Sequence, residues 1–101
     1  MAYQVTWLPG AIDDLNSIAN YIAPDSPVHA ASVVSRMLAS ATEASLLPYS
    51  CGRAQECEDQ CVRQRIVFSY RLIFRIHESR NEIEVLTVIH GARLLPEEFR
   101  H

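Results

Sequence analysis

The chain has 101 residues, 49% of them hydrophobic, and a formal net charge of −3 at pH 7. This length suits a single domain over residues 1–101 and leaves no room for a second one. No apolar run reaches the roughly 20 residues that cross a bilayer, and a negative net charge is atypical of proteins that coat nucleic acid. Because residues 1–5 also lack the pattern of a secretory signal, we expect a cytoplasmic protein without membrane contact.

The charge is distributed unevenly along the chain. Residues 1–61 contain two arginines and seven acidic residues, whereas residues 62–101 contain seven arginines and five acidic residues. All nine basic residues are arginine, which binds carboxylates and phosphates through paired hydrogen bonds but is a poor general base. We therefore expect positive potential on the C-terminal part of the fold.

The first half of the sequence predicts a strand followed by two helices. Residues 3–7 alternate apolar and polar side chains, and Pro9 then occupies the first position of a helix that ends before Pro24. Ser26 and Pro27 are residue types that begin a second helix, whose apolar positions recur at helical spacing for about five turns. Because so few residues join the two helices, they are expected to form an antiparallel hairpin.

A polar connection over residues 48–60 predicts a loop with at most one irregular turn. Cys51, Cys57 and Cys61 lie in it or directly after it, at spacings that match none of the usual zinc patterns. Free thiols are therefore favoured over a metal site, with a Cys57–Cys61 pair across one helical turn as the alternative on oxidation. We expect neither a metal nor a cofactor.

Residues 62–93 predict a three-stranded antiparallel meander. From Tyr70 to His77, apolar side chains alternate with side chains that are mostly basic, so one strand face is apolar and the other carries Arg71 and Arg75. The next four residues are typical of a hairpin turn, and a β-branched strand follows them.

Strict alternation in the last strand divides its side chains between two faces. One face would carry Ile83, Val85, Thr87 and Ile89, and the other Leu86, Val88 and His90. The ordinary pKa of histidine, near ~6.5, suits acid–base chemistry, but a half-buried structural role is the commoner one for a lone histidine such as His90. Gly91 predicts a bulge or a close approach of another backbone.

These elements together predict an α+β domain of order β-α-α-β-β-β, with the helix hairpin on one face of the sheet. The opposite face, with Arg71 and Arg75, is then expected to be free for a partner. An arginine on that face would offer its two parallel donors to a phosphodiester or to a carboxylate.

Several short motifs occur in a fixed order along the chain. They are Trp7-Leu-Pro-Gly-Ala11, Asp14-Leu15 with Ile18 to Ile22, Gly52-Arg53, Tyr70-Arg71-Leu72-Ile73-Phe74 and Val88-Ile-His-Gly-Ala-Arg93. In content and order they resemble the RelE/ParE superfamily of toxins, and the resemblance covers nearly the whole chain. It implies the growth-inhibiting toxin of a type II toxin-antitoxin system of the plasmid-stabilisation type, neutralised by a cognate antitoxin protein.

Five arginines of the C-terminal part of the chain are the candidates for contact with the target or the antitoxin. They are Arg63, Arg65, Arg71, Arg75 and Arg93. Ribonuclease members of the superfamily use an arginine at the place of Arg71 to stabilise phosphate, and an arginine at the place of Arg93 also belongs to their working groove. The ordinary structural role for Arg93 would be an ion pair with Glu97 or Glu98.

The set of residues for RNA cleavage is incomplete. Ribonuclease members resemble one another in using basic residues with a late tyrosine, or a glutamate with a His-Tyr ending, whereas Phe99 stands here about where that tyrosine would be and a phenyl ring transfers no proton. Lysine is absent, and Glu56, Glu58 and Glu84 have no evident orienting partner.

What remains, an arginine-bearing sheet with the His-Gly-Ala-Arg ending, resembles more closely the ParE-like branch, and this resemblance implies a protein that binds and poisons DNA gyrase instead of cutting a substrate. The alternative is a RelE-like, metal-independent endoribonuclease that cleaves mRNA on ribosomes with Arg71, His90 and Arg93. In either branch, the groove between hairpin and sheet could bind an antitoxin helix or strand. Candidate residues for that surface are Val34, Met37 and Tyr49.

Overall fold

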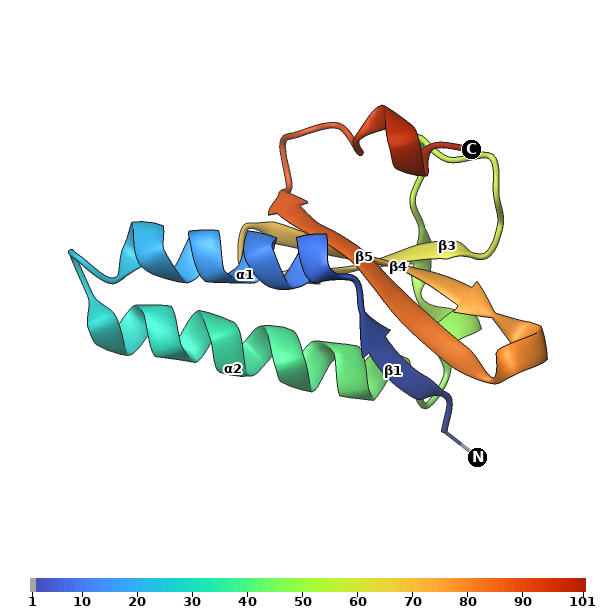
Figure 1. Ribbon diagram of the computed structural model, residues 1–101, viewed down its shortest axis with the longest axis horizontal. Helices are drawn as coiled ribbons and strands as arrows, with labels where there is room; N and C mark the ends of the chain where they lie inside the picture. Colours follow the sequence, from blue (N-terminus) through green and yellow to red (C-terminus); the bar gives the residue numbers. More distant parts are fainter. Residues whose placement is uncertain (1) are drawn as a thin grey trace.

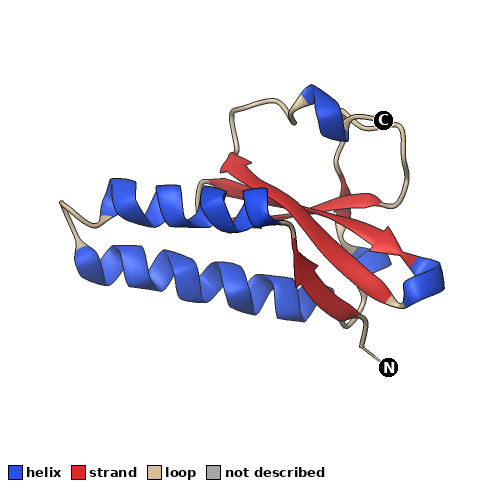
Figure 2. Cartoon of the chain, in the orientation of Figure 1, coloured by secondary structure: helices blue, strands red, loops and turns tan. Residues whose placement is uncertain are grey.

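The computed structural model describes residues 2–101, which form one mixed sheet with a pair of helices (Figures 1 and 2). The strands are β1 (Gln4–Trp7), β2 (Gly52–Arg53), β3 (Val62–Val67), β4 (Tyr70–His77) and β5 (Glu82–His90). The helices are α1 (Pro9–Ile22) and α2 (Pro27–Ala44). Short 3₁₀ turns are η1 (Pro48–Ser50), η2 (Glu78–Arg80) and η3 (Glu97–Phe99).

The order of strands across the sheet is β1-β5-β4-β3-β2. Strands β3, β4 and β5 form the predicted antiparallel meander, and the α+β class is confirmed. The sheet is nevertheless mixed, because the helix hairpin carries the chain across and lets β1 pair in parallel with β5, Val5 lying opposite Ile83. The short strand β2, which pairs with β3, was not expected in the polar connection.

The two helices form the expected hairpin and cover one face of the sheet (Figure 1). Pro9 opens α1 at a position where a missing N–H is harmless, and the Ser26 hydroxyl caps α2 by accepting a hydrogen bond of 3.1 Å from the His29 N–H. Within residues 2–101, neither helix has the length and apolarity that a membrane crossing requires.

The first core lies between the helix hairpin and the sheet. Fully buried side chains from α2 and from the sheet meet there, among them Met37 and Phe74, each 0% exposed. Burial of a side chain of this size contributes about 1.5–3 kcal/mol, so this interface holds the hairpin on the sheet. Met37 is therefore a core residue, and the expectation that it forms an antitoxin-binding surface is wrong.

A second core covers the opposite face of the sheet. Its buried members are Ala54, Cys57, Val62, Ile73, Leu86 and Leu95, and Phe99 packs against them. The loop before β3 and the segment after β5 supply the cover, which Figure 1 shows on the side away from the helices. The expectation of an open sheet face is therefore wrong, because apolar residues of two segments without regular structure bury it.

A β-bulge in β5 changes which side chains share a face. Ile73 lies opposite Thr87 but Phe74 lies opposite Val85, so Leu86 is the extra residue. Val88 consequently belongs to the first core while Leu86 belongs to the second. Strict alternation through this strand, which places those two residues together, is wrong because the bulge shifts the period by one residue.

The three cysteines are free thiols that lie on different sides of the sheet. Cys51 is in the first core, against which Cys61 packs, and Cys57 is in the second. No helical turn joins Cys57 to Cys61, so the geometry assumed for an oxidised pair is absent from this part of the described chain.

Candidate functional site

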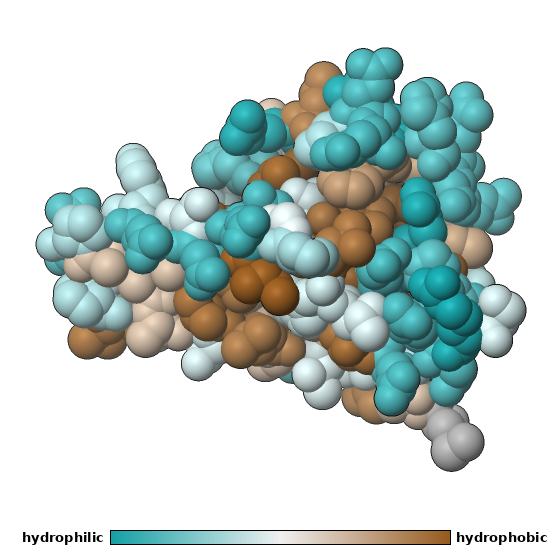
Figure 3. Space-filling view, viewed as in Figure 1, coloured by the Kyte–Doolittle hydropathy of each residue, from teal (hydrophilic) through white to brown (hydrophobic). Residues whose placement is uncertain are grey.

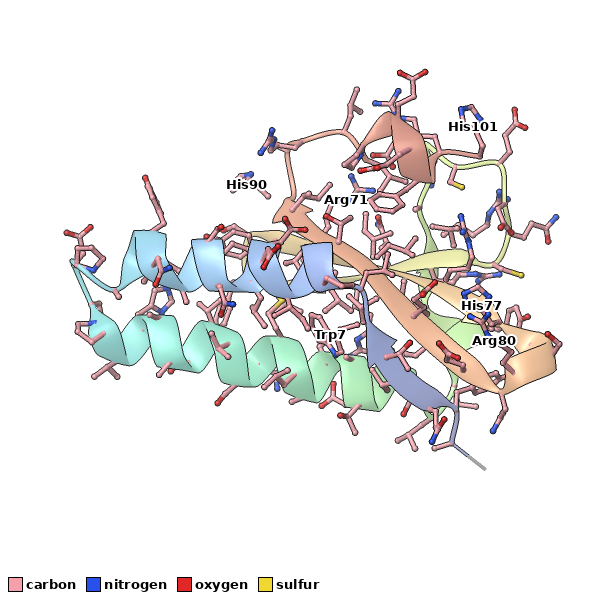
Figure 4. The ribbon with its side chains drawn as sticks, viewed as in Figure 1. Trp7, Arg71, His77, Arg80, His90 and His101 are labelled. Carbon is pink, nitrogen blue, oxygen red and sulfur yellow. The ribbon has the colours of Figure 1, made fainter. Side chains whose placement is uncertain are left out.

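Arg71 is buried on the second face of the sheet, beneath the C-terminal segment (Figure 4). The Glu56 carboxylate accepts hydrogen bonds of 2.7 Å from both Nη1 and Nη2. Gln64 Oε1 accepts from Nε at 3.0 Å and from Nη2 at 2.7 Å, and the Arg93 carbonyl accepts from Nη1 at 3.0 Å. These bonds occupy the five N–H donors of the guanidinium, so Arg71 is not free for a phosphate or another partner.

The contact with Arg71 stabilises the ionised form of Glu56. Hydrogen bonds from the Arg71 guanidinium lower the pKa of Glu56 to about 2, against the opposing effect of desolvation. The Leu95 N–H adds a bond of 2.8 Å to the same carboxylate. Glu56 therefore joins the loop before β3, strand β4 and the segment after β5, and the expectation that it has no orienting partner is wrong.

Arg63 and Arg65 are also engaged within the protein. Arg63 Nη1 donates to the carbonyls of Tyr49 and Cys51, each at 3.0 Å, and so fixes the turn after α2. Arg65 Nη2 lies 2.8 Å from the Glu43 carboxylate, which links β3 to α2. Both side chains hold neighbouring segments in place.

Polar contacts at the far end of β4 are looser. Arg75 Nε lies 3.6 Å from Asp59 Oδ2, longer than a hydrogen bond, while Nη2 reaches the His101 carbonyl at 3.4 Å. His77 Nε2 lies 3.0 Å from Glu84 Oε1, so the expectation that Glu84 has no orienting partner is wrong as well. Glu58 is exposed, and its carbonyl accepts from Arg53.

A hollow of about 440 Å³ opens between α1 and the ends of β4 and β5. It is lined by Asp14, Ser17, Ile18, Tyr21, Tyr70, Val88, Ile89, His90 and Arg93. We name it the α1–β5 hollow. Arg93 is exposed there, and none of the ion pairs among residues 2–101 includes it. The expected pairing of Arg93 with Glu97 or Glu98 does not form in this part of the chain.

Asp14 connects α1 to strand β5 at the base of the hollow. Its Oδ2 accepts from the Thr87 hydroxyl at 2.6 Å and from the Val88 N–H at 3.2 Å. Strand β1 pairs with β5 only as far as Val85, so beyond that residue this edge of β5 has no neighbouring strand. The Asp14 carboxylate takes the place of a strand there by accepting from the Val88 N–H. The Asp14 carboxylate, the acidic group of the hollow, is thus already hydrogen-bonded within the protein.

His90 is exposed at the end of β5, as Figure 4 shows, and not half-buried as expected. Its ring meets the Tyr70 ring edge to face, with centroids 5.9 Å apart, and Nδ1 accepts from the Ala92 N–H at 3.2 Å. The close backbone approach expected at Gly91 is present: its N–H donates to the Ser69 carbonyl at 2.7 Å, and an added Cβ would lie 3.1 Å from that oxygen.

The structure therefore separates the residues of the alternative ribonuclease set. Arg71 is enclosed with its donors occupied, whereas His90 and Arg93 line an exposed hollow. Phe99 packs against the second core and has no proton to transfer. In residues 2–101, no group of three His, Cys, Asp or Glu side chains is arranged to hold a metal ion. The arrangement offers contacts for binding more readily than groups for proton transfer.

Solved structures share this fold. A chain of the chromosomal ParDE system from P. aeruginosa is 20% identical, with a TM-score of 0.71, and the match covers 88% of this chain and 96% of that one. A chain of the RelBE2 toxin-antitoxin complex from Mycobacterium tuberculosis is 23% identical, with a TM-score of 0.62 and coverage of 89% and 99%. A mutant of E. coli toxin RelE in the free state is 15% identical, with a TM-score of 0.68 and coverage of 91% and 86%.

At these identities the likeness to solved structures demonstrates the fold alone, and no curated protein matches the chain. The family itself is identified by sequence. Residues 5–95 match the family model described as the ParE toxin of the type II toxin-antitoxin system, parDE. The motifs from Trp7 to Arg93, the helix hairpin and the meander all fall within or at the limits of that match. The chain belongs to the family of ParE toxins of type II toxin-antitoxin systems, within the RelE/ParE superfamily.

Proposed function

We propose that this toxin arrests growth by binding a protein target, DNA gyrase, and that a cognate antitoxin neutralises it. The observation that carries the proposal is the enclosed state of Arg71, whose five donors are bound to Glu56, Gln64 and the Arg93 carbonyl. Family membership supplies gyrase as the candidate target, and the chemistry of the site supports binding over cleavage.

RNA cleavage would require a different arrangement of charge. Attack by a 2′-hydroxyl adds negative charge to the phosphate, which positioned donors must stabilise in the transition state. Arg71 could serve only after Glu56 leaves it, and separating an enclosed ion pair costs about 3–5 kcal/mol. His90 would be poorly placed to act as a base, since the lone pair of its Nδ1 accepts from the Ala92 N–H and the proton of the neutral ring is then on Nε2.

The proposed antitoxin has an apolar surface available on the α2 and β3 side of the fold. Val28 is 78% exposed, Leu38 48%, Ile66 64% and Phe68 54%. Phe68 meets His29 edge to face at 5.7 Å, which makes the β3–β4 turn continuous with the start of α2. An area of this kind suits an apolar helix or strand, and the similar ParDE and RelBE2 structures come from a toxin-antitoxin system and a toxin-antitoxin complex.

The test uses the purified chain in two assays that run side by side. In a supercoiling assay with DNA gyrase, we expect inhibition that a stoichiometric amount of the co-encoded antitoxin reverses. In a translation reaction with ribosomes and message, we expect the message to stay intact. Fragmented message together with uninhibited gyrase would refute the proposal and favour the RelE-like endoribonuclease.

A further inference from the structure

The α1–β5 hollow contains the one predicted contact arginine whose guanidinium has no acceptor among residues 2–101. Arg63, Arg65 and Arg71 donate hydrogen bonds to protein oxygens, and Arg75 reaches the His101 carbonyl. Arg93 uses its backbone N–H and carbonyl but contributes no side-chain bond. Its charge is therefore available to an external acceptor.

Aromatic and aliphatic side chains surround this charge. Tyr21 is 82% exposed on α1, and the ring of Tyr70, which also lines the hollow, meets the His90 ring edge to face. Ile18 and Val88 form an apolar floor that also packs in the first core. Exposed tyrosine and arginine around an apolar floor are the residue types that dominate binding energy in protein interfaces.

We propose that the α1–β5 hollow receives a segment of the target protein in which a carboxylate side chain lies next to an apolar one. The carboxylate would pair with Arg93, and the apolar side chain would lie on Ile18 between the rings of Tyr21 and Tyr70. The Asp14 carboxylate does not compete for Arg93, because Thr87 and the Val88 N–H occupy it. The inference depends on the proposed function only in taking the target to be a protein.

The size and place of the hollow favour the target over the antitoxin as its occupant. A volume of about 440 Å³ holds only a few side chains, so most of the area of at least about 1,200 Å² that a stable toxin-antitoxin pair buries must lie elsewhere on the surface. The exposed apolar residues that offer such an area, Val28 and Ile66 among them, lie on α2 and β3. Figure 3 shows one face of the molecule, with apolar residues along α2 and between the helices and the sheet, and hydrophilic ones around the turn between β4 and β5.

The experiment compares single variants of the full chain for growth arrest, for binding to immobilised gyrase and for binding to the co-encoded antitoxin. Arg93→Glu and Tyr21→Ala change the hollow. Arg36→Glu is the matched charge control, because Arg36 is an exposed arginine on α2, and Leu46→Ala is the control for loss of an exposed apolar side chain, because Leu46 is 61% exposed and belongs to neither proposed surface. Thermal melting of each variant is the control for folding.

We expect Arg93→Glu and Tyr21→Ala to weaken gyrase binding at least about 10-fold and to reduce growth arrest, with antitoxin affinity within about 2-fold of the wild type. Arg93→Lys should restore part of the loss caused by Arg93→Glu. The inference is overturned if the hollow variants arrest growth like the wild type, or if antitoxin affinity falls in parallel. If the wild type arrests growth without binding gyrase, the gyrase proposal fails, and the growth assay still tests the hollow.

Discussion

Replacement of Glu56 by alanine tests whether the enclosed ion pair holds the second layer of the fold on the sheet. The Glu56 and Arg71 side chains are 16% and 10% exposed, so removal of one leaves the other as a buried, unpaired charge. Such a change costs about 3–5 kcal/mol. The Arg71 hydrogen bonds lower the pKa of Glu56 from 4.5 to about 2, which favours the ionised over the protonated carboxyl in the folded protein by about 3 kcal/mol.

The same pair makes stability depend on pH in a defined direction. Because the folded-state pKa of Glu56 is lower than the unfolded one, the unfolded chain binds more protons between about pH 4.5 and about pH 2. The contribution of Glu56 is therefore complete above about pH 4.5 and is lost as the pH falls through that window. Between about pH 6 and about pH 3, the wild type should lose about 2 kcal/mol through this group alone.

Urea denaturation at both pH values measures these quantities. We expect Glu56→Ala to lower the free energy of unfolding at about pH 6 by about 3 kcal/mol, and Glu56→Gln to lack the acid-dependent loss that Glu56 causes in the wild type. Glu58→Ala, an exposed acid on the same loop, is the control and should change stability by less than about 0.5 kcal/mol. If Glu56→Gln loses as much stability on acidification as the wild type, the ion pair does not link this segment to folding.

Three further substitutions test the packing, each by urea denaturation at neutral pH. Gly91→Ala should destabilise the fold by about 1–3 kcal/mol, since its Cβ would lie 3.1 Å from the Ser69 carbonyl oxygen, which is fixed backbone; an unchanged midpoint would contradict this close approach. Phe68→Gly should stabilise the fold by up to about 1 kcal/mol, because Phe68 has a φ of 53° that glycine adopts without strain; a loss of stability would show that its contact with the His29 ring outweighs the strain. Met37→Ala should cost about 2–5 kcal/mol, and a cost below about 1 kcal/mol would contradict its place in the core.

Much of the fold follows from patterns between neighbours in the sequence. The alternation in Tyr70–His77 and the helical spacing after Pro9 and Pro27 arise from fixed backbone periods, and the structure contains the corresponding elements. The bulge at Leu86 has no such signal, because β5 is apolar on both sides of it and both faces of the sheet are buried. When both faces of a strand are buried, the residues on either side of a bulge are apolar, so the sequence does not show that the alternation has shifted.

The candidate site was predictable in part. Arg93 is exposed beside Gly91, and its contact with a partner, which the resemblance implies, stays a prediction, whereas His90 is exposed although a half-buried structural role was expected. The acidic partner of Arg71 could not be predicted from the sequence. A buried arginine requires an acid, but the chain has twelve acidic residues, and nothing in their spacing singles out Glu56.

The sequence alone determined the two helices, the strands other than β2, their order, the hairpin, the meander and the family, because each depends on short-range periodicity or on motifs in order. Only the tertiary structure decided which arginines are available. The loop with Glu56 and the segment with Leu95 fold over the second face because together they bury apolar side chains there and give the Arg71 guanidinium its acceptors. These partners are neighbours only in the folded protein, so no periodic pattern in the sequence identifies them.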